Sequence, residues 1–204
     1  LPNLQIVIIE NGSTDNSYKI AEKLVEKYKL NHDIKLITSK KGLGYAIREG
    51  FKHAKHDWIS FCPADFSFEF SDLEYVFKNN LFYDYDLFIG SKSHKDSKVN
   101  RHISRELYSI FFNSILKFLF NISFKDTQGT FILKKTSLEK IDKIISNEFF
   151  ISTEIVIRFN KAKMKILEVP LIDYGIETVS TVSPFKDGFN MLIQAIKLRK
   201  TIKK

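Results

Sequence analysis

Residues 5–15 read QIVIIENGSTD, an apolar run that passes directly into a polar turn. The run Gln5–Ile9 has the length and the β-branched content of a buried strand. The dipeptide Asn11-Gly12 that follows is typical of turns. Residues 17–28 then place apolar side chains at helical spacing. We therefore expect a strand, a turn and a helix in that order, the opening unit of an α/β domain.

Short apolar runs and helical patterns continue to alternate through the first hundred residues. We expect further strands at 34–38, 58–62 and 87–90, and further helices at 45–54 and 71–81. This order predicts an α/β fold with a largely parallel sheet, in which ligands bind beyond the carboxyl ends of the strands. Polar clusters follow three of these ends, at residues 10–15, 63–67 and 90–93. They predict a small-molecule site at that edge.

The second half has longer helical patterns. We expect helices at 101–120, 137–145, 151–161 and from Pro184 onward, and strands at 130–133 and 165–169. The helix at 101–120 has an aromatic-rich face, which suits either the core or a lipid surface. Polar residues interrupt the apolar stretch 108–124, so that stretch is a poor candidate for a membrane-spanning helix.

Composition and charge restrict the class of protein. Apolar residues make up 44% and charged residues 27% of the 204, which excludes a disordered chain, and the single Cys62 excludes an internal disulfide. Residues 1–100 hold 14 basic and 14 acidic residues, so the net charge of +8 lies in residues 101–204, which hold 18 and 10. The tail KLRKTIKK is either a solvated helix end or a contact for a polyanion such as an anionic membrane surface. No nucleic-acid motif is present, and we expect no nucleic-acid partner.

Three carboxylates follow predicted strands. Asp65 comes just after the strand at 58–62, where it suits Mg²⁺ or Mn²⁺, although capping of the turn is the alternative role. Glu10 ends the first strand, where a carboxylate can accept hydrogen bonds from a base or a ribose. Asp15 is better suited to the cap of the next helix.

Basic residues mark a possible site for phosphate. Lys92, Arg101 and Arg105 occur where the charge of the chain becomes positive, and arginine binds phosphate in a bidentate manner. A solvated surface position is the alternative for each. The segment KGLG at 41–44 is a glycine turn without the full spacing of a nucleotide-binding loop.

Taken together, six segments in order resemble the signatures of family 2 glycosyltransferases. They are Ile8–Asp15 (V-D-D-G-S-T-D), Lys41–Ala46 with Gly50-Phe51 (K-G-x-G-x-A…G-F), Pro63–Ser67 (D-A-D-L-S), Gly90–Lys92 (G-S-R), Arg101 and Ser104 with Asp126–Phe131 (R…S and D-T-x-x-G-F), and Glu154 with Glu168–Pro170 (E…E-V-P). The closest subgroup resembles the dolichyl- or polyprenyl-phosphate sugar transferases. The resemblance implies a Rossmann-like GT-A fold in a single domain, 1–204, whose half 1–100 binds the nucleotide sugar and whose half 101–204, with its basic C-terminal helix, binds the acceptor.

The resemblance also implies an activity and its place. It implies an inverting, metal-dependent transfer of a hexose from a GDP- or UDP-linked sugar to a polyprenyl or dolichyl phosphate, with Mg²⁺ or Mn²⁺ as cofactor. Such an enzyme works as a cytoplasmic, peripheral protein at the cytoplasmic face of a membrane. Because a lipid phosphate is already anionic, its attack needs positive charge more than it needs a general base.

Site residues carry over from the matching motifs. The implied catalytic residues are Asp65, Arg101 and Lys92, and the implied metal ligands are Asp65 and Ser67. The implied nucleotide-binding residues are Glu10, Asn11, Gly12, Lys41, Gly42, Ala64 and Asp65. The implied acceptor-binding residues are Lys92, Arg101, Ser104, Arg105, Gln128 and Glu154.

The chain departs from the family pattern at four places. Glu10 and Asn11 replace the first pair of aspartates, Pro63 replaces the first aspartate of D-A-D, and Lys92 replaces an arginine. These changes motivate the alternative of a weakened relative that binds a nucleotide sugar or a partner without turnover. A sugar hydroxyl as acceptor would need a base, for which Asp126 and Glu154 are the nearest candidates.

The fourth departure concerns the start of the chain. The family's first strand, with P-x-Y-N-E, is absent from a sequence that begins at Leu1. We therefore expect a segment of a longer product, with a strand missing between residues 6–9 and 58–62. If expressed alone, such a segment would be loosely folded because two sheet edges would be left unpaired.

Overall fold

The computed structural model of the chain describes residues 4–66, 68–99, 103–173 and 184–202. Of the side chains in the last two ranges, those of residues 103–105 and 184–187 are not described. Helices and strands alternate through the first half, as the sequence predicts. The molecule is an α/β fold with two separate sheets.

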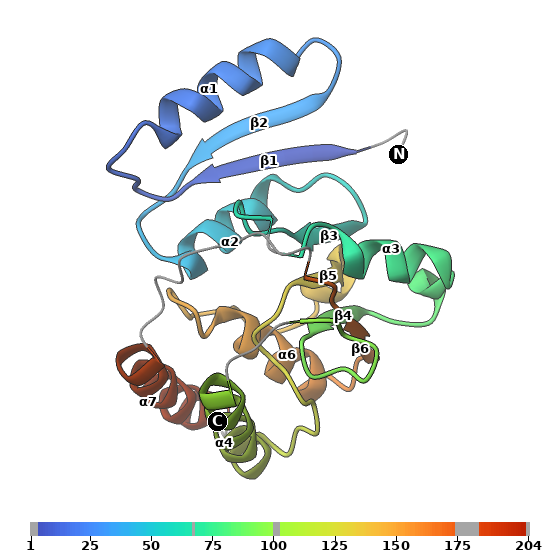
Figure 1. The fold of residues 1–204 in the computed structure, drawn as a ribbon, viewed down its shortest axis with the longest axis vertical. Coiled ribbons are helices and arrows are strands. Elements are labelled where there is room, and N and C mark those ends of the chain that lie inside the picture. Colours follow the sequence, from blue (N-terminus) through green and yellow to red (C-terminus); the bar gives the residue numbers. More distant parts are fainter. Residues whose placement is uncertain (1–3, 67, 100–102, 174–183, 203–204) are drawn as a thin grey trace.

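A two-stranded parallel sheet forms one end of the molecule (Figure 1). It pairs β1 (Gln5–Glu10) with β2 (Asp33–Thr38), and α1 (Ser17–Tyr28) packs on β2. Every residue of these three elements is half-buried or exposed. The unit therefore has little buried apolar surface to hold it together.

The second sheet has the strand order β3-β5-β4-β6. Its strands are β3 (Trp58–Phe61), β5 (Phe131–Lys134), β4 (Leu87–Ser91) and β6 (Ile166–Pro170). β4 and β6 run parallel, whereas β5 runs antiparallel to both β3 and β4. The sheet is therefore mixed, and the prediction of a mainly parallel sheet is wrong. The direction of β5 could not be predicted, because a short apolar run such as FILK carries no information about its direction.

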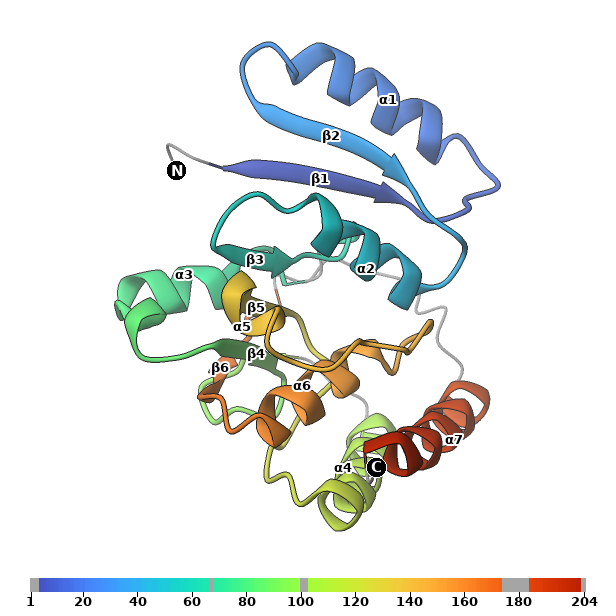
Figure 2. The same ribbon diagram turned by 180° about the vertical axis from the view of Figure 1, so that it is seen from behind.

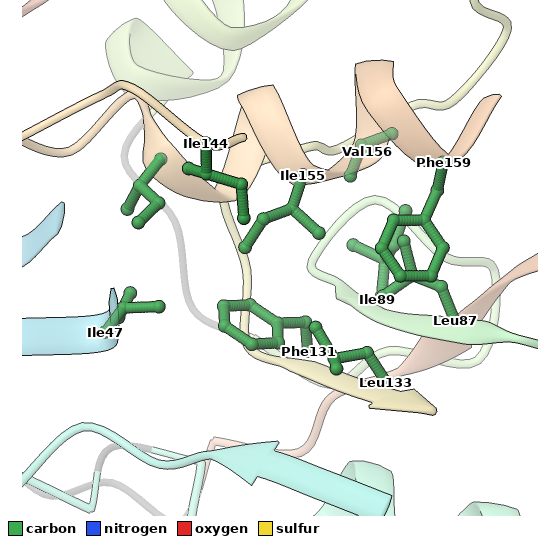
Figure 3. Close-up of a cluster of buried hydrophobic side chains, with 10 residues drawn as sticks. Ile47, Leu87, Ile89, Phe131, Leu133, Ile144, Ile155, Val156 and Phe159 are labelled. Atoms are coloured by element: carbon green, nitrogen blue, oxygen red, sulfur yellow. The ribbon is translucent and has the colours of Figure 1, made fainter. Parts of the chain in front are cut away.

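The main core lies between the second sheet and two helices. These are α2 (Leu43–His53), which also contacts β1, and α6 (Ile151–Lys161). Figure 3 shows side chains of α6 pointing toward β4 and β5, with Ile47 reaching the same cluster from α2. All nine residues from Ile151 to Phe159 are buried, so α6 is a central helix of the molecule.

Smaller helices differ from the prediction. The helix α3 (Ser71–Lys78) stops three residues early, because Asn80 adopts a left-handed φ of 54° before the short 3-10 turn η1 (Leu81–Tyr83). The helix expected at 137–145 is wrong. Only α5 (Lys135–Leu138) is helical there, and the backbone N–H groups of residues 145 and 146 bond to a side chain instead.

Two long helices lie at the end opposite the small sheet (Figure 2). These are α4 (Ile103–Phe120) and α7 (Pro184–Ile202), and they pack against each other through a second apolar cluster around Leu116 and Leu198. Among the helices that the structure describes, none is both long and apolar enough to cross a membrane.

Among the described residues, no strand pairing joins the two sheets. Among the described strands, β1 pairs only with β2, and β3 pairs only with β5. The second sheet draws two strands from each half of the chain, so residue 100 does not divide it into separate layers.

Candidate functional site

The first polar cluster follows β1. The Ser13 backbone N–H donates to Glu10 Oε1 at 2.5 Å, and this bond is the main reason why the pKa of Glu10 lies below its ordinary value. Asn11 connects this turn to the start of α2. Its Oδ1 accepts from the Gly42 N–H at 3.0 Å, and its Nδ2 donates to the Lys40 carbonyl at 2.7 Å. Asn11 therefore holds the two predicted nucleotide-binding segments together.

Glycine is required at two positions of this cluster. Gly12 has a φ of 73° and Gly42 has a φ of 127°, which side-chain-bearing residues rarely adopt. A Cβ on Gly42 would also lie 2.5 Å from the Asn147 carbonyl oxygen. The exposed Lys41 precedes Gly42 in the chain, and its Cβ lies 3.3 Å from the position of a Cβ on Gly12.

The second cluster follows β3. Ala64 and Asp65 are exposed on a turn, and Phe66 adopts a φ of 52° although it is not glycine. Such a left-handed residue stores backbone strain, a feature that clusters at functional sites. Just before this turn, burial and the nearby charges of Asp72 and Asp65 raise the pKa of the Cys62 thiol to about 11. The thiol therefore stays protonated and is a poor nucleophile.

Asp72, in the first turn of α3, was not singled out from the sequence. Its side chain is only 3% exposed, and the Thr130 hydroxyl donates to its Oδ2 at 2.6 Å. Burial raises the pKa of this carboxyl above its ordinary value. An aspartate in the first turn of a helix is common for local reasons, so no sequence signal marked it.

The third cluster follows β4 and adjoins the second. Because β3 and β4 both run antiparallel to β5, their carboxyl ends share one edge of the sheet. The Lys92 ammonium lies 5.3 Å from the ring centroid of Phe68, which belongs to the turn after β3. The Lys92 backbone N–H donates to Asp126 Oδ2 at 3.1 Å. The structure therefore brings the Asp65 turn, Lys92 and the 126–130 turn together.

Asp126 and Glu154, the two candidate bases, are turned to the interior. Asp126 is 2% exposed, and its oxygens accept from the backbone N–H groups of Lys92 and Gln128. Glu154 is fully buried, and its oxygens accept from two backbone N–H groups and from Arg158. These bonds give both carboxylates structural roles, and neither presents a free surface to a ligand.

Of the remaining predicted site residues, only Gln128 has a described side chain. The Gln128 side-chain amide lies 3.6 Å from the Met191 sulfur of α7, so it joins the turn to the second helix pair. Ser67 and Arg101 lie outside the described residues. Ser104 and Arg105 belong to the first turn of α4, but their side chains also lie outside the description.

A divalent ion would have few protein ligands here. Among the described residues, no group of three or more histidine, cysteine, aspartate or glutamate side chains could hold a metal. Mg²⁺ commonly binds through one or two carboxylates plus the phosphates of a substrate. The exposed Asp65 carboxylate fits an ion that is shared with a nucleotide diphosphate, and it does not fit a closed protein cage.

Comparison with known proteins found a matching family and similar sequences. The family model described as glycosyl transferase family 2 matches residues 1–142. A dolichyl-phosphate β-glucosyltransferase of Saccharomyces cerevisiae is 29% identical over 82% of the chain and 56% of its own length. The glycosyltransferase AglD of Haloferax volcanii is 24% identical over 82% of the chain and 27% of its own length. The chain thus spans little more than half, or less, of these two relatives.

A solved structure has the same fold. Glucosyl-3-phosphoglycerate synthase from Mycobacterium tuberculosis, in complex with Mn²⁺, UDP and glucosyl-3-phosphoglycerate, superposes with a TM-score of 0.62. The superposition covers 96% of this chain and 68% of that one, at 12% identity. At this identity the likeness establishes the GT-A fold and not the substrate.

Proposed function

Because the chain belongs to glycosyl transferase family 2, we propose that it is a glycosyltransferase that moves a hexose from a GDP- or UDP-linked sugar to a polyprenyl or dolichyl phosphate. The proposal treats 1–204 as one domain, with the donor on residues 1–100 and the acceptor on residues 101–204. One observation carries it: the exposed Asp65 and the cationic Lys92 lie on adjoining turns at one edge of the second sheet.

The donor side uses the cluster after β1 and the turn before α2. The Glu10 carboxylate, whose pKa the Ser13 N–H holds below its ordinary value, can accept hydrogen bonds from a base or a ribose. Asn11 fixes Gly42, and the positive φ angles of Gly12 and Gly42 give the two turns their shape. Lys41 is exposed and adds a positive charge beside them.

Asp65 and Ala64 complete the donor side. Asp65 is the residue that would hold Mg²⁺ or Mn²⁺ together with the diphosphate, and Ser67 is the second proposed ligand. When bound, the ion neutralises charge on the departing nucleotide. The M. tuberculosis synthase, whose structure contains Mn²⁺ and UDP, supports this choice of cofactor.

The acceptor side needs cations and no base. A phosphate oxygen of the lipid attacks the anomeric carbon, and the bond to the nucleotide diphosphate breaks as that group leaves with the electron pair. Lys92 lies where it can hold the acceptor phosphate, with Arg101, Ser104 and Arg105 as further proposed contacts. The burial of both candidate bases, Asp126 and Glu154, supports an acceptor that is already ionised.

The helix pair α4 and α7 is the proposed contact with an anionic membrane. On α4, exposed apolar residues recur at spacings of three, four and seven, which puts them on the side opposite buried Leu116: Leu107, Ile110, Phe111 and Phe118. On α7 the same spacing repeats, opposite buried Met191 and Leu198, in Phe189, Ile193 and Ile196. An exposed apolar surface of this extent is typical of a protein or membrane contact.

Charge favours the membrane over a protein partner for this surface. Lys117, Lys197 and Lys200 are exposed on the same two helices, and each basic residue near an anionic bilayer contributes about 1 kcal/mol. We therefore propose that this part of the chain binds peripherally to the cytoplasmic face of a membrane. Nucleic acid is not among the proposed partners.

Transfer of radiolabelled sugar tests the proposal. The full-length protein is incubated with GDP- or UDP-linked hexose, Mn²⁺ and a polyprenyl phosphate in vesicles. We expect Asp65→Ala to lower the rate about a hundredfold, the usual scale for removing one charge-stabilising group. Glu22→Ala, which removes an exposed carboxylate on α1, is the control and should leave the rate unchanged. Nucleotide binding without transfer would favour the non-catalytic alternative that Pro63, Glu10 and Asn11 suggest.

A further inference from the structure

The segment between α5 and α6 lies against the start of α2 (Figure 2). Residues 145–147 of this segment have no regular secondary structure, yet Ser146 is buried. Irregular backbone inside a protein needs partners for its polar groups. Two sets of side chains supply them, one on α6 and one on α2.

On the α6 side, Glu154 holds the backbone of the segment. Its Oε2 accepts from the Ser146 N–H at 2.7 Å, and its Oε1 accepts from the Ile145 N–H at 3.0 Å. The same Oε1 accepts from Arg158 Nε at 2.7 Å, and Arg158 is 5% exposed. The buried glutamate is thus compensated by a buried arginine and by two backbone donors.

On the α2 side, the segment supports the glycine turn. The Gly44 N–H donates to the Asn147 carbonyl at 2.9 Å, and Arg48 donates to the Ser146 carbonyl and to the Asn147 side chain. A Cβ on Gly44 would lie 2.7 Å from the Asn147 backbone. The turn at 42–44 therefore rests directly on residues 146 and 147.

These contacts form one continuous chain of bonds from the interior to the donor side. Glu154 holds residues 145 and 146, that segment holds Gly44 and Arg48, and Gly42 is in turn bonded to Asn11 at the end of β1. Each of these hydrogen bonds has a backbone group on at least one side, and the covalent backbone joins Gly44 to Gly42. A displacement of the 145–147 backbone would therefore move the turn that carries Lys41.

We propose that Glu154, with Arg158, is a positioning residue that sets the donor-binding turn at residues 41–44 through the 145–147 backbone, rather than a contact for the acceptor. The inference rests on the proposed function, in which that turn binds the nucleotide. Glu154 acts through the segment, since its oxygens accept from the Ile145 and Ser146 N–H groups while α2 bonds to the carbonyls of Ser146 and Asn147.

Glu154→Gln is the sharpest variant, because it keeps the shape of the side chain. An amide has one oxygen and two N–H donors, whereas the glutamate accepts from donors on both oxygens. At least one of the Ser146 and Arg158 donors would then face another donor, so the segment must shift. Arg48→Met releases the same segment from the α2 side without leaving a buried charge, and it serves if the glutamine variant fails to fold.

The matched control is Ile157→Val on the same helix. Ile157 is 2% exposed and packs in the cluster of Leu116 and Leu198, whereas Ile144, beside the 145–147 segment, packs in the other core cluster. The variant therefore loosens α6 without touching the proposed link. A general loss of stability would appear in the control as well as in the two test variants.

Two measurements on the full-length protein decide the proposal. In hydrogen exchange, Glu154→Gln and Arg48→Met should each raise the exchange rates of the Gly44 amide and of the amides at 145–147 about tenfold. This corresponds to a decrease of about 1.4 kcal/mol in the opening free energy. Ile157→Val should leave these rates unchanged. In calorimetric titration with UDP or GDP in the presence of Mn²⁺, the dissociation constant should rise about tenfold in the two variants only. The KM for the lipid phosphate should stay unchanged.

The outcomes separate the inference from the proposed function. If the wild type binds neither UDP nor GDP, the proposed function fails and the donor role of Glu154 fails with it. If the wild type binds one of them and both variants bind it equally well, only the inference is overturned. A rise in the KM of the acceptor with unchanged nucleotide affinity would instead support Glu154 as an acceptor-site residue, against this inference.

Discussion

Replacing Phe118 with serine should weaken membrane binding without affecting the fold. The Phe118 side chain is 87% exposed on α4, so it contributes little to the core. Full burial of a phenylalanine is worth about 1.5 to 3 kcal/mol. Because 87% of its surface is available to be buried, the expected loss is about 1.3 to 2.6 kcal/mol, or roughly 10- to 80-fold in partitioning.

Sedimentation with sucrose-loaded vesicles of phosphatidylglycerol and phosphatidylcholine measures this partitioning. Tyr83→Ser is the matched control, because Tyr83 is also 87% exposed but lies on η1, outside α4 and α7. We expect the control to bind as the wild type does. Equal binding by Phe118→Ser and the wild type, or equal losses in both variants, would refute a membrane contact through α4.

Three further predictions concern stability. Burial raises the pKa of Asp72 above its ordinary value of 3.8, so the folded state binds the proton more tightly and stability contributed by this group is lost as pH rises from 3.8 through the folded pKa. In urea unfolding, the free energy of unfolding of Asp72→Asn minus that of the wild type should therefore increase as the pH is raised from about 3.5 to about 7.5. A difference that does not change with pH would contradict the assignment. Gly129→Ala would drive a methyl group into the Gly90 carbonyl oxygen and should cost about 3 kcal/mol or more in the same assay, whereas Gly188→Ala on α7, which meets no neighbour within 4 Å, should instead stabilise the fold by about 0.5 to 1 kcal/mol through helix propensity. Amides of β1, α1 and β2 should exchange faster than those of β4, because no residue of the first unit is buried while all five residues of β4 are; equal protection would show that the small sheet is held as firmly as the core.

Sequence patterns predicted the regular elements well where local signals were strong. The run at Gln5–Ile9 is a strand, and the helices at 17–28 and 151–161 have the expected bounds. The prediction of a helix at 137–145 is wrong because hydrogen bonds formed only in the folded chain hold the end of this segment in a non-helical conformation. Those bonds come from Glu154, nine residues away from Ile145.

The sequence predicted a site from three polar clusters at one edge of a sheet, and the structure puts the clusters after β3 and β4 at one edge but β1 in a separate sheet. The polar turns after β1, β3 and β4 could be located from strand endings alone, and the proximity of Lys92 to the turn after β3 follows the rule for such edges. Asp72 could not be found in this way, because its importance comes from burial against Thr130, 58 residues away in sequence. The role of Glu154 also could not be found from the sequence. Its motif predicts a contact with a ligand, whereas in the structure Glu154 forms a buried ion pair with Arg158.

The α/β class, the family resemblance and the basic character of the second half could be read from the chain alone, because periodicity, motif order and charge need no contacts. The antiparallel direction of β5, the separation of the two sheets and the interior position of Glu154 became visible only in the fold. Strand direction and burial depend on which distant residues meet, and a local pattern such as FILK or ISTE is compatible with more than one set of partners. A carboxylate in a motif becomes a ligand or a support for the backbone according to which donors the fold brings to it.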